Sequence, residues 1–164
     1  MLARHYEVNG VVEAQPEEVF AYLDDHARLS SHMSQSSWKM GGGRMELRLD
    51  EEKGRSVGSR IRLAGRAFGV ALFVEEKVTE RAPPHRKAWE TIGTPRLLVI
   101  AHYRLGFDIA SEGRGSSLRV FIDYAVPTKG FSKWLGVVFG DAYAKWCVRQ
   151  MLHDTQARFA STGS

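Results

Sequence analysis

The sequence predicts one α+β domain in which a curved antiparallel sheet wraps around a long C-terminal helix. Apolar and polar residues alternate with a period of two in six segments between residues 44 and 127. Every link between these segments is short, which is typical of neighbouring antiparallel strands. From about Thr128 to Phe159 no proline occurs and apolar residues recur three and four positions apart, which predicts one helix of roughly 45 Å. One face of the predicted sheet is apolar, so we expect the helix to cover it.

Length and composition agree with a single domain over residues 1–164. The chain has 164 residues, of which 43% are hydrophobic and 26% are charged, and this is enough apolar material for one sizeable core. Its net charge is +4, but the arginines between residues 44 and 66 alternate with apolar residues and form no basic block. We therefore expect no nucleic-acid partner.

The composition also bears on the compartment. The N-terminal residues lack the apolar core of a signal peptide, and no apolar run approaches the ~18 residues that would span a bilayer. The single cysteine, Cys147, cannot form an internal disulfide and fits a reducing compartment as a packed thiol. We expect a cytoplasmic protein without a transmembrane segment.

The N-terminal part predicts a strand followed by two short helices. Residues 5–14 alternate weakly between apolar and polar, and the pattern stops at Gln15 and Pro16. A proline at a first helical position, followed by two acids, predicts a short helix that begins at Pro16. Residues 26–33 predict a second short helix, and residues 34–44, with three consecutive glycines, predict a loop.

Six further strands complete a predicted sheet of seven. Their ranges are 44–52, 59–65, 68–81, 87–93, 97–110 and 117–127. The apolar faces of the last two strands consist of Ala101, Tyr103, Leu105, Phe107 and Ile109, and of Leu118, Val120, Ile122, Tyr124 and Val126. Ala88 and Trp89 compete for the inner face of their strand. We expect Trp89 there, because a large aromatic ring gains more by burial.

The long helix carries two apolar stripes. The stripe that we expect to pack on the sheet consists of Trp134, Val137, Val138, Ala144, Val148, Met151, Leu152, Thr155 and Phe159. The first half carries a second stripe of Phe131, Leu135, Phe139, Ala142 and Trp146. Either the preceding loop and short helices cover this second stripe, or it docks on another protein, a second copy of the chain or a membrane surface.

The order of these elements resembles the START/Bet v 1 superfamily, in its bacterial polyketide cyclase/dehydrase-like branch. The resemblance rests on the opening VNGVVEAQPEEVFAYLDD, the strand LRVFIDYAVP and the closing WLGVVFGDAYAKW, and it covers roughly Tyr6 to Phe159. It implies a helix-grip fold with a hydrophobic cavity between the sheet and the long helix. Members carry lipids, sterols, hormones or flavonoids, cyclise polyketides, assist quinone handling or act as partner proteins. The superfamily has no universal catalytic motif, so no residue here inherits a catalytic role.

Three polar residues are candidates for catalysis in such a cavity: Tyr103, Tyr124 and Asp141. Each tyrosine either fills the core with its ring while its hydroxyl makes one hydrogen bond, or orients a ligand carbonyl or phenol. Asp141 lies within the helix stripe and would be costly to bury without a partner. It either pairs with Lys145 or a strand arginine, or acts as a general acid or base at the cavity floor.

The predicted ligand-binding residues add aromatic and apolar neighbours to this set. They are Trp89, Tyr103, Phe107, Tyr124, Trp134, Val138, Asp141, His32 and Trp38. His32 and Trp38 are included because the family's cavity mouth borders the second short helix, and a surface loop without a role is the alternative. No Cys, Asp or Glu near His32 completes a zinc set, and nucleotide-binding and hydrolase motifs are absent, so we expect no metal and no cofactor.

Three functions from different classes follow from this sequence. The first is binding of a small hydrophobic or aromatic ligand, such as a lipid, a polyketide or a quinone-like molecule. The alternative is an enzyme of cyclase or dehydratase type, in which Asp141, Tyr103 or Tyr124 moves protons on a poly-carbonyl substrate. A third interpretation uses the second helix stripe for protein interaction, homo-oligomerisation or peripheral membrane contact.

Overall fold

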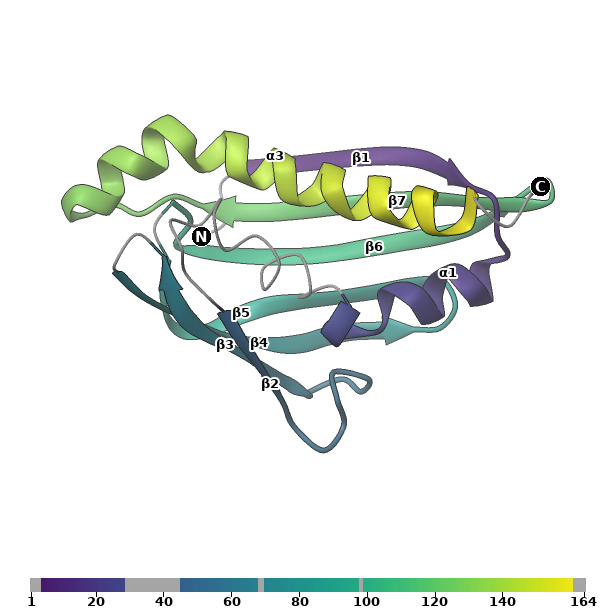
Figure 1. The fold of residues 1–164 in the computed structure, drawn as a ribbon, viewed down its shortest axis with the longest axis horizontal. Coiled ribbons are helices and arrows are strands. Elements are labelled where there is room, and N and C mark those ends of the chain that lie inside the picture. Colours follow the sequence, from purple (N-terminus) through teal and green to yellow (C-terminus); the bar gives the residue numbers. More distant parts are fainter. Residues whose placement is uncertain (1–3, 29–44, 68–69, 98, 161–164) are drawn as a thin grey trace.

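The computed structural model describes residues 4–28, 45–67, 70–97 and 99–160, and these ranges contain a seven-stranded antiparallel sheet, a short helix and a long helix (Figure 1). The strands are β1 (Arg4–Val12), β2 (Met45–Leu49), β3 (Arg60–Ala67), β4 (Val70–Ala82), β5 (Arg86–Arg96), β6 (His102–Glu112) and β7 (Gly115–Ala125). The helices are α1 (Pro16–Leu23) and α3 (Gly130–Ala160).

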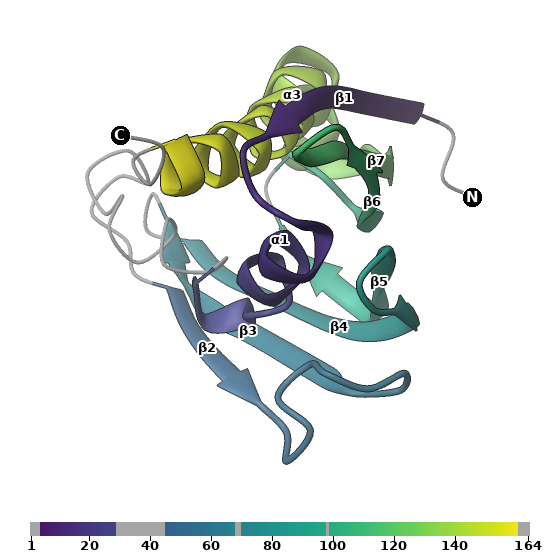
Figure 2. The same ribbon diagram turned by 90° about the vertical axis from the view of Figure 1, so that its right-hand side faces the viewer.

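The sheet is a meander that the first strand completes at one edge. Its order is β1-β7-β6-β5-β4-β3-β2, and all neighbouring pairs are antiparallel. The β4–β5 pairing changes register twice, between Phe73 and Glu75 and between Val78 and Glu80. Such irregularities bend and twist a strand pair. The sheet is accordingly curved, with β2–β4 turned toward the side on which α3 lies (Figure 2). The predicted curved seven-stranded sheet and helix-grip arrangement are confirmed.

Most strand boundaries lie within a few residues of the prediction, and the largest differences concern the neighbours of the 94–101 segment. The sequence predicted that proline would end β5 after Gly93, but β5 continues to Arg96, which pairs with Phe73 beyond the first register change. The sixth strand was expected from residue 97 and begins at His102. Pro95 lies near this register change, where a proline removes no regular ladder hydrogen bond, so β5 continues past Pro95.

Helix α3 lies along β1 and β7 (Figures 1 and 2), and its buried stripe consists of small and medium residues. The buried residues are Gly136, Gly140, Ala144, Val148, Met151 and Thr155. A Cβ atom added to Gly140 would lie 2.9 Å from Val126 Cγ1 and 2.9 Å from the Val99 carbonyl oxygen. The helix therefore approaches the chain around the end of β7 more closely than any larger residue would allow.

The prediction for the first half of the packed stripe was wrong. Trp134, Val137 and Val138 were expected against the sheet, but they are 59%, 60% and 49% exposed. The helical period pointed to the bulky apolar residues, whereas the close approach of the helix to Val99 and Val126 is made by the glycines. The rear half agrees with the prediction, since Ala144, Val148, Met151 and Thr155 are buried.

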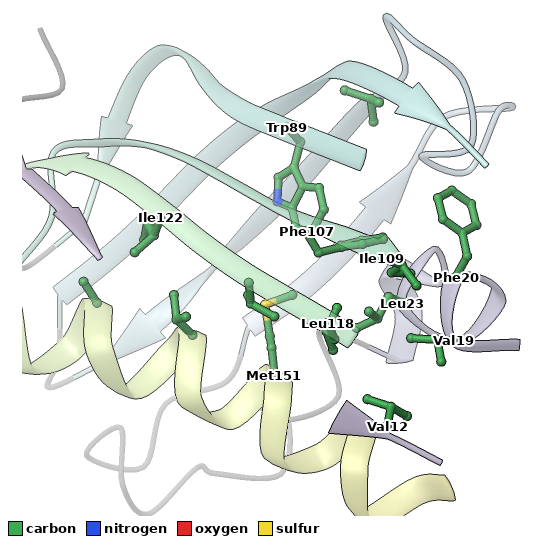
Figure 3. Close-up of a cluster of buried hydrophobic side chains, with 14 of the residues drawn as sticks. Val12, Val19, Phe20, Leu23, Trp89, Phe107, Ile109, Leu118, Ile122 and Met151 are labelled. Carbon is green, nitrogen blue, oxygen red and sulfur yellow. The ribbon is translucent and has the colours of Figure 1, made fainter. Parts of the chain in front are cut away.

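The core joins α1, the inner face of the sheet and the rear half of α3 (Figure 3). The ring of Phe107 on β6 contacts Phe20 of α1, with ring centroids 5.7 Å apart, and Trp89 of β5, with centroids 6.3 Å apart. Trp89 is 3% exposed and lies on the inner face, as expected. Helix α1 begins at Pro16, as expected, and the side chains of Gln15 and Glu18 form a reciprocal capping box at its start.

The second predicted short helix lies only partly within the described residues. Residues 26–28 are helical. The rest of that predicted helix and the predicted loop, with the candidate residues His32 and Trp38, lie outside the described ranges.

Candidate functional site

A buried carboxyl group on β4 is the centre of the candidate site. Leu72, Val74, Glu76 and Val78 alternate along the inner face, and Glu76 is only 4% exposed. Burial raises the pKa of Glu76 to about 7, although interactions with Tyr103, Trp89 and the Lys87 charge act to lower it. Its Oε2 atom has no hydrogen-bond partner among the described residues. A buried oxygen of this kind is rare in folded proteins and points to a missing partner.

Tyr103 links this carboxyl group to helix α3. Burial and the neighbouring Glu76 carboxyl raise the pKa of Tyr103 well above its usual value, and Tyr143 and Cys147 of α3 raise it further. Burial likewise raises the pKa of Cys147 to about 12, against a hydrogen bond with Tyr143. The thiol is therefore protonated at neutral pH and is no nucleophile. Side chains from β4, β5, β6 and α3 thus meet at one place inside the fold.

A second polar cluster lies beside the first and joins α1 to the sheet. Lys87 is fully buried, and its Nζ donates to Asp24 Oδ1 at 2.7 Å. Arg81 donates to both carboxylate oxygens of Asp24, at 3.2 and 2.9 Å, and Arg55 lies 4.0 Å from Oδ2. Burial acts to raise the pKa of Asp24, but the hydrogen bonds from Arg81 and Lys87 outweigh it and lower the pKa. The cluster holds the C-terminal end of α1 against β4 and β5.

His26 supports Trp89 from the α1 side. Its ring packs edge-on against Trp89, with centroids 4.9 Å apart, and it is 4% exposed. Burial and the Lys87 charge lower the pKa of His26 to about 3, so the ring is neutral at physiological pH. A Cβ atom on Gly54, which has a φ of +75°, would lie 2.4 Å from His26 Cδ2. The β2–β3 loop therefore closes over this histidine and fixes Trp89.

Asp141 lies at the surface of α3, where it is paired with an arginine. Its side chain is 53% exposed, Arg4 of β1 donates to Oδ1 at 2.8 Å, and Tyr124 donates to the same oxygen. These hydrogen bonds lower the pKa of Asp141. Of the two alternatives left open for this residue, the pair with a strand arginine is the one observed. The physical reason is that Asp141 lies on the side of α3 that faces β1.

The two candidate tyrosines are neighbours in the sheet but have different partners. Tyr103 and Tyr124 are directly opposite each other on β6 and β7. The hydroxyl of Tyr124 points to Asp141, and burial together with Asp141 raises its pKa to about 12, whereas Tyr103 interacts with Glu76. The three catalytic candidates therefore do not form one group, and Tyr103 alone belongs to the cluster around Glu76.

The remaining predicted ligand-binding residues fall into two sets. Trp89 and Phe107 are buried in the core beside the Glu76 cluster, and Trp134 and Val138 lie exposed on the first half of α3. Sequence reasoning missed Glu76 and Lys87. The signal was present for both, because Glu76 continues the inward alternation of Leu72 and Val74, and Lys87 is two residues from the inward Trp89.

The described ranges contain neither a membrane-spanning helix nor a metal-binding cluster. No helix there has an apolar stretch long enough to cross a bilayer. No group of three or more histidine, cysteine or acidic side chains in the same ranges is placed to hold a metal ion.

Comparisons with known proteins agree with this architecture. A family model described as "Polyketide cyclase / dehydrase and lipid transport" matches residues 4–160. No curated protein matches the chain. Among solved structures, TTHA0849 from Thermus thermophilus is similar over 98% of this chain and 100% of its own, with 16% identity and a TM-score of 0.67.

Two further solved structures show the same fold at low identity. CV1439 from Chromobacterium violaceum covers 94% of this chain and 96% of its own, with 16% identity and a TM-score of 0.62. The similarity to the structure of Ara h 8.0201 covers 92% of this chain and 98% of that chain, with 11% identity and a TM-score of 0.56. At such identities the likeness concerns the fold alone.

Proposed function

Because this chain belongs to the polyketide cyclase/dehydrase and lipid transport family, we propose that it binds a small hydrophobic or aromatic ligand between the sheet and helix α3. The ligand class is that of a lipid, a polyketide or a quinone-like molecule. The lone Cys147 suits a reducing compartment, so we place this function in the cytoplasm.

The proposal rests on the exposed aromatic side chains of α3, of which Tyr143 is the central one. Tyr143 is 40% exposed, and the neighbouring Cys147, together with burial, raises its pKa well above the usual value. A partly exposed aromatic side chain beside a partly buried thiol suits the wall of an apolar ligand site. Phe139 and Trp146 follow the same side of α3 at helical spacing and are 50% and 42% exposed. Together with Tyr143 they form a partly exposed apolar wall on α3.

The test is binding of Nile red, a neutral dye that fluoresces in apolar surroundings. We expect the wild-type protein to bind it and Tyr143→Lys to bind about tenfold or more weakly, because a charge in an apolar wall is desolvated at high cost. Val57→Lys is the matched control, since Val57 is 61% exposed on the β2–β3 loop. The proposal fails if the wild type neither binds the dye nor carries an organic molecule in native mass spectrometry.

One observation favours a second candidate function, the cyclase or dehydratase type of enzyme. Glu76, with a pKa of about 7, lies beside Tyr103 and can both give and take a proton near neutral pH. On a poly-carbonyl substrate it would take a proton from the carbon between two carbonyls, and that carbon would attack a distant carbonyl. Tyr103 would protonate the resulting alkoxide, and the proton taken by Glu76 would then pass to the Tyr103 phenolate, which restores both groups. Turnover of such a substrate should be lost in Glu76→Gln and Tyr103→Phe and kept in Asp141→Asn; equal turnover in all three rules this mechanism out.

The exposed apolar residues at the start of α3 support an additional role in association. Trp134, Val137 and Val138 are about half or more exposed. A second copy of the chain or a membrane surface would cover them. Light scattering of Val138→Glu tests the first, since an interface mutant lowers the mass, and sedimentation with phospholipid vesicles tests the second.

A further inference from the structure

We propose that Glu76 is the polar anchor of the binding site and that its Oε2 atom accepts a hydrogen bond from a hydroxyl group, an alcohol or a phenol, at the buried end of an otherwise apolar ligand. The inference rests on the proposed function, because it names the ligand class for the same site. It starts from the observation that Oε2 is buried without a partner in the described residues.

The groups around Glu76 indicate that it serves as an acceptor. The Trp89 indole N–H can only donate a hydrogen bond. Both Trp89 and the Tyr103 hydroxyl interact with the Glu76 carboxyl group in a way that favours the ionised carboxylate. These two donors leave a carboxylate with unused acceptor capacity in a place without water contact. A third donor, supplied by the ligand, would complete the set and remove the cost of the unpaired oxygen.

The local charge favours a neutral donor over an ammonium group. Lys87 is close enough that its charge lowers the pKa of Glu76. In the adjacent cluster Lys87, Arg81 and Arg55 surround the single acid Asp24, so the net charge there is positive. A cationic ligand would meet repulsion from these residues, whereas a hydroxyl brings no charge. A carbonyl lacks a proton to donate and would pair only with protonated Glu76.

The arrangement also assigns an orientation to the ligand. Phe139, Tyr143 and Trp146 are partly exposed on α3, whereas Glu76 is buried on β4, so a ligand that reaches both has its apolar body at the helix and its polar end inside the fold. The apolar body would lie along Phe139, Tyr143 and Trp146, with the hydroxyl end directed to β4. His26 packs behind Trp89 and stays neutral, and therefore adds no competing charge.

The experiment compares two probes that differ in one proton donor. Titration calorimetry measures the affinity of 2-naphthalenemethanol and of its methyl ether, which has the same rings and an acceptor oxygen but no O–H. We expect the wild type to prefer the alcohol by about tenfold or more, as for a hydrogen bond to a charged acceptor. The alcohol's affinity should also rise from pH 6 to pH 8, because the hydroxyl pairs with the ionised carboxylate.

Two variants assign this preference to Glu76. In Glu76→Leu the alcohol and the ether should bind within about twofold of each other, because the acceptor is gone. Glu75→Leu is the matched control: Glu75 is the next residue on the same strand, pairs with Arg60 and Arg62, and should leave the preference intact. If Glu76→Leu does not fold, Glu76→Gln serves instead, and its affinity for the alcohol should no longer depend on pH between 6 and 8.

The outcomes separate this inference from the proposed function. Wild-type protein that binds Nile red but binds alcohol and ether equally overturns the role of Glu76 and leaves cavity binding standing. A preference for the alcohol that survives in Glu76→Leu also overturns it. Wild-type protein that binds neither Nile red nor either probe contradicts the proposed function and the inference with it.

Discussion

The phenol of Tyr124 donates a hydrogen bond to the carboxylate of Asp141, and this pair, together with Arg4, ties β7 and β1 to the first half of α3. The pair resembles a catalytic arrangement in sequence, since a tyrosine and an acid both fall on apolar stripes. In the structure it is a link at the protein surface, because more than half of the Asp141 side chain is exposed.

Tyr124→Phe should therefore lower stability and leave ligand binding unchanged. The loss expected for one hydrogen bond is about 1 kcal/mol. Urea denaturation measures it, with Nile red affinity as the second readout. Tyr103→Phe is the control, since it should alter binding. A clear loss of Nile red affinity in Tyr124→Phe would instead mean that Tyr124 and Asp141 contribute to ligand binding.

The raised pKa of Glu76 makes stability depend on pH in a defined direction. The group titrates near 4.5 in the unfolded chain and near 7 in the folded protein, so the folded state binds more protons between these values. Its contribution to stability is therefore full below pH 4.5 and is lost as the pH rises through 7.

Glu76→Gln should remove this dependence. From pH 4.5 to pH 8 the stability of Glu76→Gln relative to the wild type should increase by about 3 kcal/mol, and all other titrating groups cancel in the comparison. Chemical denaturation of both proteins across this range measures it. A constant difference between them would mean that Glu76 titrates normally and is hydrated.

The two partners of the buried ion pair between Asp24 and Lys87 should differ in their response to mutation. Asp24→Asn leaves the fully buried Lys87 charge without its acid and should cost about 3–5 kcal/mol. Lys87→Met should cost less, because Asp24 keeps Arg81 and the methionine fills an apolar site. Urea midpoints of the two variants give the order, and the reverse order would show that Lys87 is not desolvated.

The close contact at Gly140 predicts that a Gly to Ala substitution in α3 lowers stability, opposite to its usual effect in a helix. Gly to Ala in an exposed helix usually stabilises by up to about 1 kcal/mol. Gly140→Ala should instead destabilise by about 1–3 kcal/mol, since its Cβ would lie 2.9 Å from both Val126 Cγ1 and the Val99 oxygen. Thermal unfolding measures the change. Ala157→Gly, at an exposed position of the same helix, should lower stability and thus shows the normal propensity effect.

The positions of the elements could be predicted from local patterns, but the partners of the polar residues could not. The 3.6-residue and two-residue periods report which residues share a face, so α3 and the meander order followed from the sequence. They do not report which of several apolar faces is packed. Trp134 and Val138 matched the expected stripe, yet Gly136 and Gly140 make the contact, because a residue without a side chain lets the helix approach the segment that follows β7.

What the sequence determined by itself is the helix-grip fold, because this fold follows from element order, short links and one long helix. What only the tertiary structure decided is the chemistry of the interior. Glu76 became a site residue because the curvature of the sheet brings β4, β5 and β6 around it, with Tyr103 and Trp89 as donors and one oxygen unpaired. Asp141 pairs with Arg4 because the rotation of α3 turns it toward β1. Burial and pairing depend on contacts between distant segments, and no local period encodes them.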